Sequence, residues 1–242
     1  MTNDLELIKS RGINYIRIYG SDCNSVPNVL PIAASLGLKV NQGFWFSQYQ
    51  VDSIDSGVSD LISYGQQYGW DVIDFVTVGN EAINDGFLTV SQLTSKIASV
   101  KSLLQAAGYT GQITTAEPPN SFIDNPSLCT QSAIDFVSVN AHSYFDQYAA
   151  PSDAGTFVAG QVQLVQNVCG SKNVFVAETG YPSQGATNGL NVPTPENQAI
   201  AIQAILSVYG TDITILTTFD DFWKAPGPYG IEQYFGAIQL FS

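Results

Sequence analysis

Two glutamates end strand-like runs of the sequence and are candidates for acid–base chemistry. Glu81 ends VTVGNE, and Glu178 ends VFVAE. A carboxylate at the end of a buried strand does not help to stabilise the strand, because burying an unpaired charge costs free energy. Glycoside hydrolysis uses two carboxylates: one acid protonates the leaving oxygen, and the other attacks the anomeric carbon or activates water. The pair predicts such a site, whereas either glutamate alone is equally compatible with an ion pair or a helix cap.

Strand-like and helix-like segments that alternate along the whole chain must position these carboxylates. The strand-like runs are β-branched and apolar, and they cover residues 13–20, 38–46, 72–82, 112–118, 135–145, 173–182 and 214–223. Regular alternation of this kind predicts a parallel sheet, closed or doubly wound, with strands buried on both faces. In closed barrels the catalytic groups gather at the carboxyl ends of the strands. We find no linker in the sequence, which predicts a single domain over residues 1–242.

The helix-like segments carry recognisable signals at their ends. Residues 89–107 have apolar side chains at helical spacing, with Thr89 or Ser91 as a candidate N-cap and Gly108 just past the end. Another helix is expected to open at Thr194-Pro195, since proline favours the first helical position. The chain opens on a helix, from about Asn3 to Ser10, and not on a strand.

Composition restricts the class of partner. The formal net charge is −13, which argues against nucleic acids and anionic membrane surfaces and fits a neutral ligand. No run of residues has the apolar length of a membrane span. His142 is the only histidine, so a His-based metal site is not expected, and we expect no cofactor. A phosphate-binding metabolic barrel is disfavoured because no glycine-rich phosphate loop or Schiff-base lysine is evident.

Two motifs identify a family resemblance. GNEA at residues 79–82 and ETGYPSQG at residues 178–185 resemble the signature segments of glycoside hydrolase family 17. The match extends through residues 17–23, 126–145 and 219–236 and looks closest to the fungal β-1,3-glucanase and β-1,3-glucanosyltransferase branch. The resemblance implies a TIM-like (β/α)8 barrel and a retaining reaction through a covalent glycosyl-enzyme.

The resemblance also assigns roles and surroundings. It makes Glu81 the general acid/base and Glu178 the nucleophile, and we expect a raised pKa for Glu81 because it must start protonated. Asn80 would hydrogen-bond the sugar 2-hydroxyl; otherwise it is a strand-end cap. The implied partner is β-1,3-glucan or laminari-oligosaccharides, acted on by a secreted or cell-wall enzyme that we expect to be a monomer.

Further side chains are candidates for substrate binding, each with a simpler alternative. Tyr19 and Tyr144 would line the reacting-sugar subsite or pack in the top of the barrel. His142 would be a hydrogen-bonding group of the groove and not a base. Glu117 would line the groove or pair with a neighbour.

The last candidates lie at or just beyond the ends of the second, sixth and seventh strand-like runs. Asp221 and Lys224 match an acidic and basic pair that the family places near its site; otherwise they form a surface ion pair of little energetic value. Trp45, Tyr181 and Trp223 are candidate platforms for sugar rings, since pyranoses present apolar faces to aromatic side chains.

One departure from the family concerns the barrel itself. The family's usual first strand is missing from this chain, and we expect residues 235–242 or a partner to cover the gap, because open strand edges are rarely tolerated. The three cysteines allow one internal disulfide. Cys129 precedes one strand-like run and Cys169 the next, so we expect these two to pair and Cys23 to remain free.

Two other functions stay open from the sequence. One is a retaining barrel hydrolase that acts on another β-glycan, such as mannan or cellulose, against which the ETGYPS motif argues. The other is a non-catalytic barrel that only binds glucan, against which the presence of both carboxylates argues.

Overall fold

The computed structural model describes all residues from Met1 to Ser242, and its seven strands follow one another in chain order in one sheet. The residues group into two compact units. The first contains residues 1–138 and 166–174, and the second contains residues 139–165 and 175–242. None of the helices is both long and apolar enough to cross a bilayer.

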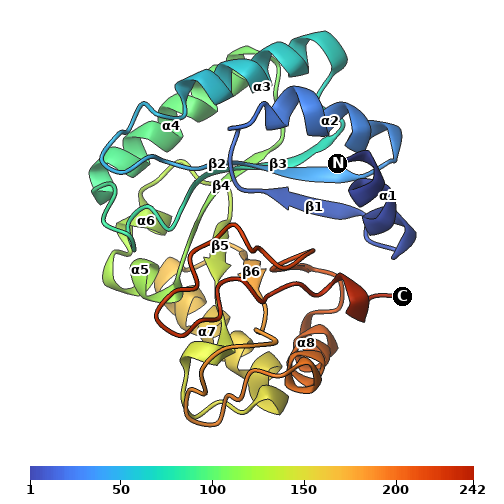
Figure 1. The fold of residues 1–242 in the computed structure, drawn as a ribbon. Helices are drawn as coiled ribbons and strands as arrows, with labels where there is room; N and C mark the ends of the chain where they lie inside the picture. The colour runs from blue at the N-terminus through green and yellow to red at the C-terminus, as the bar shows by residue number, and fades with distance from the viewer. The chain divides into compact units, whose positions relative to one another are not determined.

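The first unit is built on four parallel strands joined by helices. Its strands are β1 (Tyr15–Ile18), β2 (Lys39–Phe44), β3 (Ile73–Asn80) and β4 (Gln112–Glu117). Its helices are α1 (Thr2–Ser10), α2 (Ser25–Ser35), α3 (Asp55–Tyr68), α4 (Val90–Ala106), α5 (Pro119–Asp124) and α6 (Ser127–Thr130). Figure 1 shows α2, α3 and α4 side by side along these strands, with α3 in the middle. The parallel register brings the carboxyl ends of the four strands to one edge, as predicted.

Apolar packing between strands and helices forms the core of this unit. Strands β2 to β4 are buried along nearly their whole length, as the continuous apolar runs predicted, whereas β1 is largely half-exposed. The fully buried side chains come from both layers and include Leu30, Val40, Leu61, Val76, Leu93, Ile97, Leu104 and Ile113.

Helix α4 begins where the sequence predicted. Thr89 accepts a hydrogen bond from the backbone of Gln92, and the Gln92 side chain accepts from the Thr89 backbone, which is a complete capping box. Gly108 follows the last turn with a φ of 92°, a conformation that favours glycine. The capping box and Gly108 thus mark the two ends of α4, the helix that connects β3 to β4.

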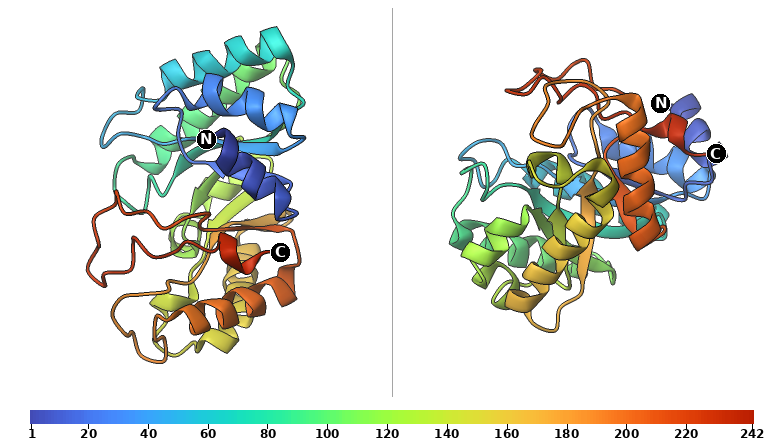
Figure 2. Two further views of the ribbon diagram at one scale, coloured as in Figure 1. Left: turned by 45° about the vertical axis from the view of Figure 1, so that its right-hand side comes forward. Right: turned by 90° about the horizontal axis from the view of Figure 1, so that it is seen from below.

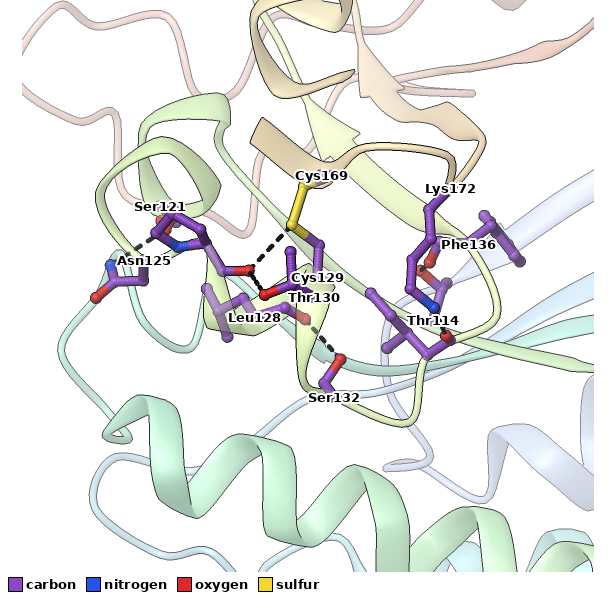
Figure 3. Close-up of a disulfide and its surroundings, with 12 residues drawn as sticks. Thr114, Ser121, Asn125, Leu128, Cys129, Thr130, Ser132, Phe136, Cys169 and Lys172 are labelled. Atoms are coloured by element: carbon purple, nitrogen blue, oxygen red, sulfur yellow. Dashed lines mark hydrogen bonds between the residues drawn. A yellow bond between two sulfur atoms is a disulfide. The ribbon is translucent and has the colours of Figure 1, made fainter. Parts of the chain in front are cut away.

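A disulfide joins Cys129 on α6 to Cys169 at the end of α7 (Ala154–Cys169), which is the pair expected from their positions before successive strands (Figure 3). Cys23 is free and exposed. The bond links the entry to β5 (Val137–Asn140) with the entry to β6 (Val174–Thr179).

The second unit holds the ends of β5 and β6 and the rest of the chain. It contains the 3-10 turns η1 (Ser143–Phe145), η2 (Pro151–Asp153) and η3 (Ile238–Leu240), most of α7, helix α8 (Pro195–Tyr209) and the short strand β7 (Ile213–Ile215). Thr194 caps α8 and Pro195 opens it, as predicted. Figure 2 shows that the chain after β7 runs as coil until η3.

Residues 235–242, which we expected to cover the gap in the barrel if no partner does, do not form a strand. Thr217 donates to the carbonyl of Phe235 and accepts from the amide of Ala237, and the chain then turns into η3. The segment therefore folds back on the residues that follow β7. The predicted last strand, residues 214–223, is also reduced to the three residues of β7.

Candidate active site

Glu81 stands on a tight turn at the carboxyl end of β3. Gly79 has a φ of 87°, and a Cβ there would lie 3.0 Å from the ring of Phe46, so glycine is required both for conformation and for space. Glu81 itself has a φ of 55°, which is uncommon for a residue with a side chain. Its amide donates to Ala116 on β4, and the Asn84 side-chain amide donates to its Oε2 at 3.2 Å.

Asn80, beside Glu81, is buried and connected to the end of β1. The Arg17 guanidinium donates to Asn80 Oδ1 at 2.7 Å and also lies 4.3 Å from the centroid of the Tyr19 ring. Gly43 allows this arrangement, because a Cβ there would lie 2.4 Å from the carbonyl oxygen of Ile18. The first unit thus brings Tyr19, Asn80 and Glu81 to the same edge of the sheet, as the sequence predicted.

Glu117, at the end of β4, does not line a groove. Its side chain is fully buried, and its two oxygens accept from the backbone amides of Ile83 at 2.9 Å and Asn84 at 3.1 Å. Burial raises the pKa of Glu117 to about 7, although these amides and the Ser121 hydroxyl act in the opposite direction. The predicted groove-lining role is therefore corrected to contact with the turn that follows Glu81.

Glu178 and His142 form a pair in the second unit. Glu178 is the second-last residue of β6. Its Oε1 is 3.1 Å from Nε2 of His142, which follows β5. The Glu178 carbonyl accepts from the amide of Ala141, so backbone and side-chain contacts both fix it. His142 thus contacts the Glu178 carboxylate, and its expected contact with substrate stays a prediction.

Tyr144 and Tyr181 are core residues in this structure, and their predicted contact with sugar is corrected. Both are fully buried, and their rings meet edge to face at 6.2 Å. The Tyr144 hydroxyl donates to the carbonyl of Ala186 at 2.7 Å. Burial raises the pKa of Tyr181 to about 12, which agrees with a packing role.

Asp221, Trp223 and Lys224 form one cluster after β7. Lys224 Nζ lies 2.8 Å from Asp221 Oδ2, and the Trp223 indole donates to Asp221 Oδ1 at 3.1 Å. The Trp223 ring is 81% exposed, as a platform for a sugar ring would have to be. Gln233 holds the cluster in place, since its side chain donates to the Lys224 carbonyl and its own carbonyl accepts from the Asp221 amide.

Two polar residues near Glu81 were missed as site candidates from sequence. Arg17 could have been nominated from the sequence, because it is a charged residue near the end of a strand-like run and charged residues are rare in such runs. Asn84 lies three residues past Glu81 in an exposed turn, and no sequence pattern distinguishes it from an ordinary loop residue.

A family model for the BtgE/BtgC glycoside hydrolase domain matches residues 1–236. The chain belongs to this glycoside hydrolase family. Its BtgE/BtgC domain is 43% identical over 225 residues to a probable family 17 glucosidase of Saccharomyces cerevisiae, covering 92% of the chain and 56% of that protein. It is 39% identical to a cell surface mannoprotein of Candida albicans, covering 96% of the chain and 60% of that protein. The chain thus spans little more than half of these relatives.

Solved structures agree with this assignment. The BtgE/BtgC domain superposes on a family 17 β-1,3-glucanosyltransferase from Rhizomucor miehei with a TM-score of 0.84 and 23% identity, covering 98% of the chain and 85% of that structure. At this identity the likeness establishes the fold, and it confirms the predicted TIM-like α/β barrel class. The recognised resemblance to the fungal branch of family 17 is likewise confirmed.

Proposed function

We propose that this chain is a glycoside hydrolase or glucanosyltransferase that acts on β-1,3-glucan with retention of anomeric configuration. In this proposal Glu81 is the acid/base and Glu178 is the nucleophile. The observation that carries the proposal is the placement of both glutamates. Each occupies the end of a strand, is bonded through its backbone to the neighbouring strand and has a polar side chain on its carboxylate. This is where barrel enzymes carry their catalytic groups.

The reaction follows from the chemistry of two carboxylates. Glu178 attacks the anomeric carbon while protonated Glu81 gives its proton to the departing glycosidic oxygen, so one C–O bond forms as the other breaks. Glu81, now ionised, takes a proton from water or from an acceptor sugar hydroxyl, which displaces Glu178. Retention requires the two carboxyl groups to be about 5–5.5 Å apart in the working enzyme.

The side chains next to the carboxylates have supporting roles in this proposal. His142 holds one oxygen of Glu178 and so orients the nucleophile. Asn80, fixed by Arg17, is available to the sugar 2-hydroxyl, a contact that strengthens in the transition state. The exposed ring of Trp223, with Asp221 and Lys224 beside it, is suited to stack on a sugar and bind its hydroxyls.

Substrate and location are inferred from the relatives. A variant of the Rhizomucor miehei enzyme has been solved in complex with laminaritriose, which supports β-1,3-glucan as the substrate class. The Candida albicans relative is a cell surface mannoprotein, which supports a secreted or cell-wall location.

Trapping the intermediate tests the nucleophile directly. A 2-deoxy-2-fluoro laminaribioside with a good leaving group should accumulate the glycosyl-enzyme, and peptide mass spectrometry should find the label on Glu178. Glu178→Gln should remove both labelling and activity on laminari-oligosaccharides. Labelling of another residue, or activity retained in Glu178→Gln, would contradict the assignment.

Glu81 is tested by the same substrates. Glu81→Gln should lose about 10²–10⁴-fold in kcat/KM on laminari-oligosaccharides, the usual contribution of general acid catalysis. Glu196→Gln, an exposed carboxylate in the first turn of α8, is the matched control and should remain fully active. Products longer than the substrate would identify transfer, and glucan binding without any turnover would identify a binding module.

A further inference from the structure

A buried carboxylate of the first unit has no part in the two-carboxylate reaction. Glu117 is fully shielded from solvent, and both of its oxygens are used by the backbone amides of Ile83 and Asn84. A buried charge persists only where such hydrogen bonds compensate the lost hydration. Apart from the Ser121 hydroxyl, the hydrogen bonds of this buried carboxylate all go to one short stretch of backbone.

That stretch is the turn that follows Glu81. The Asp85 amide donates to the Glu81 carbonyl, and the Asn84 side chain donates to Glu81 Oε2. Asn84 therefore connects the two carboxylates: its backbone amide is held by Glu117, and its side-chain amide holds Glu81. The turn also needs such support, because the φ of 55° at Glu81 is unfavourable for a residue with a side chain.

We propose that Glu117 is a positioning residue for the acid/base, which fixes the Ile83–Asn84 turn so that Asn84 keeps Glu81 oriented for proton transfer. This inference rests on the proposed function of Glu81. A misplacement of about 1 Å at a reacting group can cost on the order of 10²-fold in rate, so a fixed turn has a direct kinetic value.

Electrostatics adds a second contribution. The charge of Glu81 is among the influences that raise the pKa of Glu117, so the two carboxylates interact. The two carboxylates therefore repel each other when both are ionised, in addition to their connection through Asn84. Asp85 is the other titratable group on the turn; its Oδ1 lies 3.2 Å from the Asn84 side-chain nitrogen, and burial raises its pKa.

Asp135, which lies just before β5 and contacts the start of β4, offers a control. Asp135 accepts from the amide of Ile113, near the start of β4, with its Oδ2 at 2.8 Å, and it also pairs with Lys101. It is a carboxylate that holds backbone beside β4, as Glu117 does, but at the end of the strand away from Glu81. Asp135→Asn therefore measures how much the loss of a carboxylate–amide contact affects stability and activity at a site remote from Glu81.

Leaving-group dependence separates positioning of the acid from general structural support. Laminari-oligosaccharides need a proton on the departing oxygen, whereas 2,4-dinitrophenyl β-laminaribioside does not. Glu117→Gln keeps the size of the side chain but replaces one acceptor by a donor. It should lose on the order of 10²-fold in kcat/KM on the oligosaccharide, with little change on the dinitrophenyl substrate.

Asp135→Asn should affect both substrates equally or not at all. Equal losses on both substrates in Glu117→Gln, or no loss on either, would overturn the inference. Asn84→Ala changes an exposed residue of the same chain of contacts, and it should show the same split if the Glu117 variant does not fold. An Asn84→Ala enzyme without the split would equally overturn it.

Failure of the proposed function gives a different pattern. If Glu81→Gln is as active as the wild type on the oligosaccharide, the assignment of the acid/base itself fails. If Glu81→Gln shows the split between substrates and neither Glu117→Gln nor Asn84→Ala does, only the positioning role of Glu117 fails.

Discussion

Glu81 shows, at the scale of the residue, what sequence can and cannot supply. Its type and its place at the end of VTVGNE were sufficient to nominate it, because charge is rare in buried strands. Its backbone conformation was not accessible in this way, since a φ of 55° at a glutamate is maintained by contacts from Ala116 and Asn84. Such conformations cost of order 1–3 kcal/mol and persist only where the surroundings hold them.

Glu117 gives a prediction about stability and pH. Its pKa is raised to about 7 in the folded protein, from an ordinary value of 4.5. Between these two values the folded state binds more protons at this site than the unfolded chain does, so this site makes folding less favourable as pH rises. The full effect is about 3 kcal/mol, lost progressively from about pH 4.5 to pH 7.

Glu117→Gln removes that titration. The difference in free energy of unfolding between wild type and Glu117→Gln, measured with urea at several pH values, should shift in favour of the variant as pH rises through this window. Asp135→Asn, measured in parallel, separates this effect from the general consequence of losing a carboxylate–amide contact. A wild-type-minus-Glu117→Gln difference that does not change between pH 4 and pH 8 would contradict the raised pKa.

Aromatic residues mark the limit of residue-level prediction. Tyr144 and Trp223 both lie at the ends of strand-like runs, yet one is fully buried and the other is 81% exposed. An aromatic side chain serves equally well in a core or on a surface. The buried Tyr144 bonds to the carbonyl of Ala186, 42 residues away in the sequence, and packs against Tyr181 and Tyr229. Local sequence periodicity does not predict such long-range contacts.

At the scale of the element, the strands were largely predictable and their ends were not. Runs of β-branched and apolar residues located all seven strands because buried parallel strands need them. The last run overestimated β7, since after Ile215 the backbone of Thr217 bonds to Phe235 and Ala237 instead of continuing the sheet. Hydrogen bonds between distant segments decide where a strand stops, and local composition does not encode them.

The disulfide gives a prediction about stability at the scale of the element. Cys129 and Cys169 are separated by 40 residues, so their bond removes considerable freedom from the unfolded chain. The double variant Cys129→Ser with Cys169→Ser should lose about 2–4 kcal/mol in free energy of unfolding. Thermal and urea unfolding measure this loss directly.

Cys23→Ser is the matched control for that variant. Cys23 is exposed and unbonded, so its replacement should change stability by no more than about 0.5 kcal/mol. Equal stabilities of the wild type and the double variant would show that the bond contributes nothing to the folded state in solution.

At the scale of the whole molecule, composition gave the charge and alternation predicted a parallel sheet, whereas the barrel class came from the family resemblance. The net charge of −13 and the regular order of strands and helices follow from the amino acids alone. The path of the last residues was not accessible, because it depends on hydrogen bonds between segments that composition does not record. These last residues form η3 and bond to Thr217 and Thr218 in their own unit.

The charge leads to a last prediction, which rests on the proposed neutral substrate. A protein of net charge −13 has no long-range attraction for a neutral glucan, so salt has nothing to screen during binding. Raising ionic strength from about 0.1 M to 1 M shortens the Debye length from about 10 Å to about 3 Å, and the KM for laminari-oligosaccharides should stay constant. For a carboxymethylated β-1,3-glucan, the same change should raise kcat/KM, because salt weakens the repulsion between two anions. A KM for the neutral oligosaccharide that rises steeply with salt would mean that charge attraction drives binding, which the proposed substrate class does not allow.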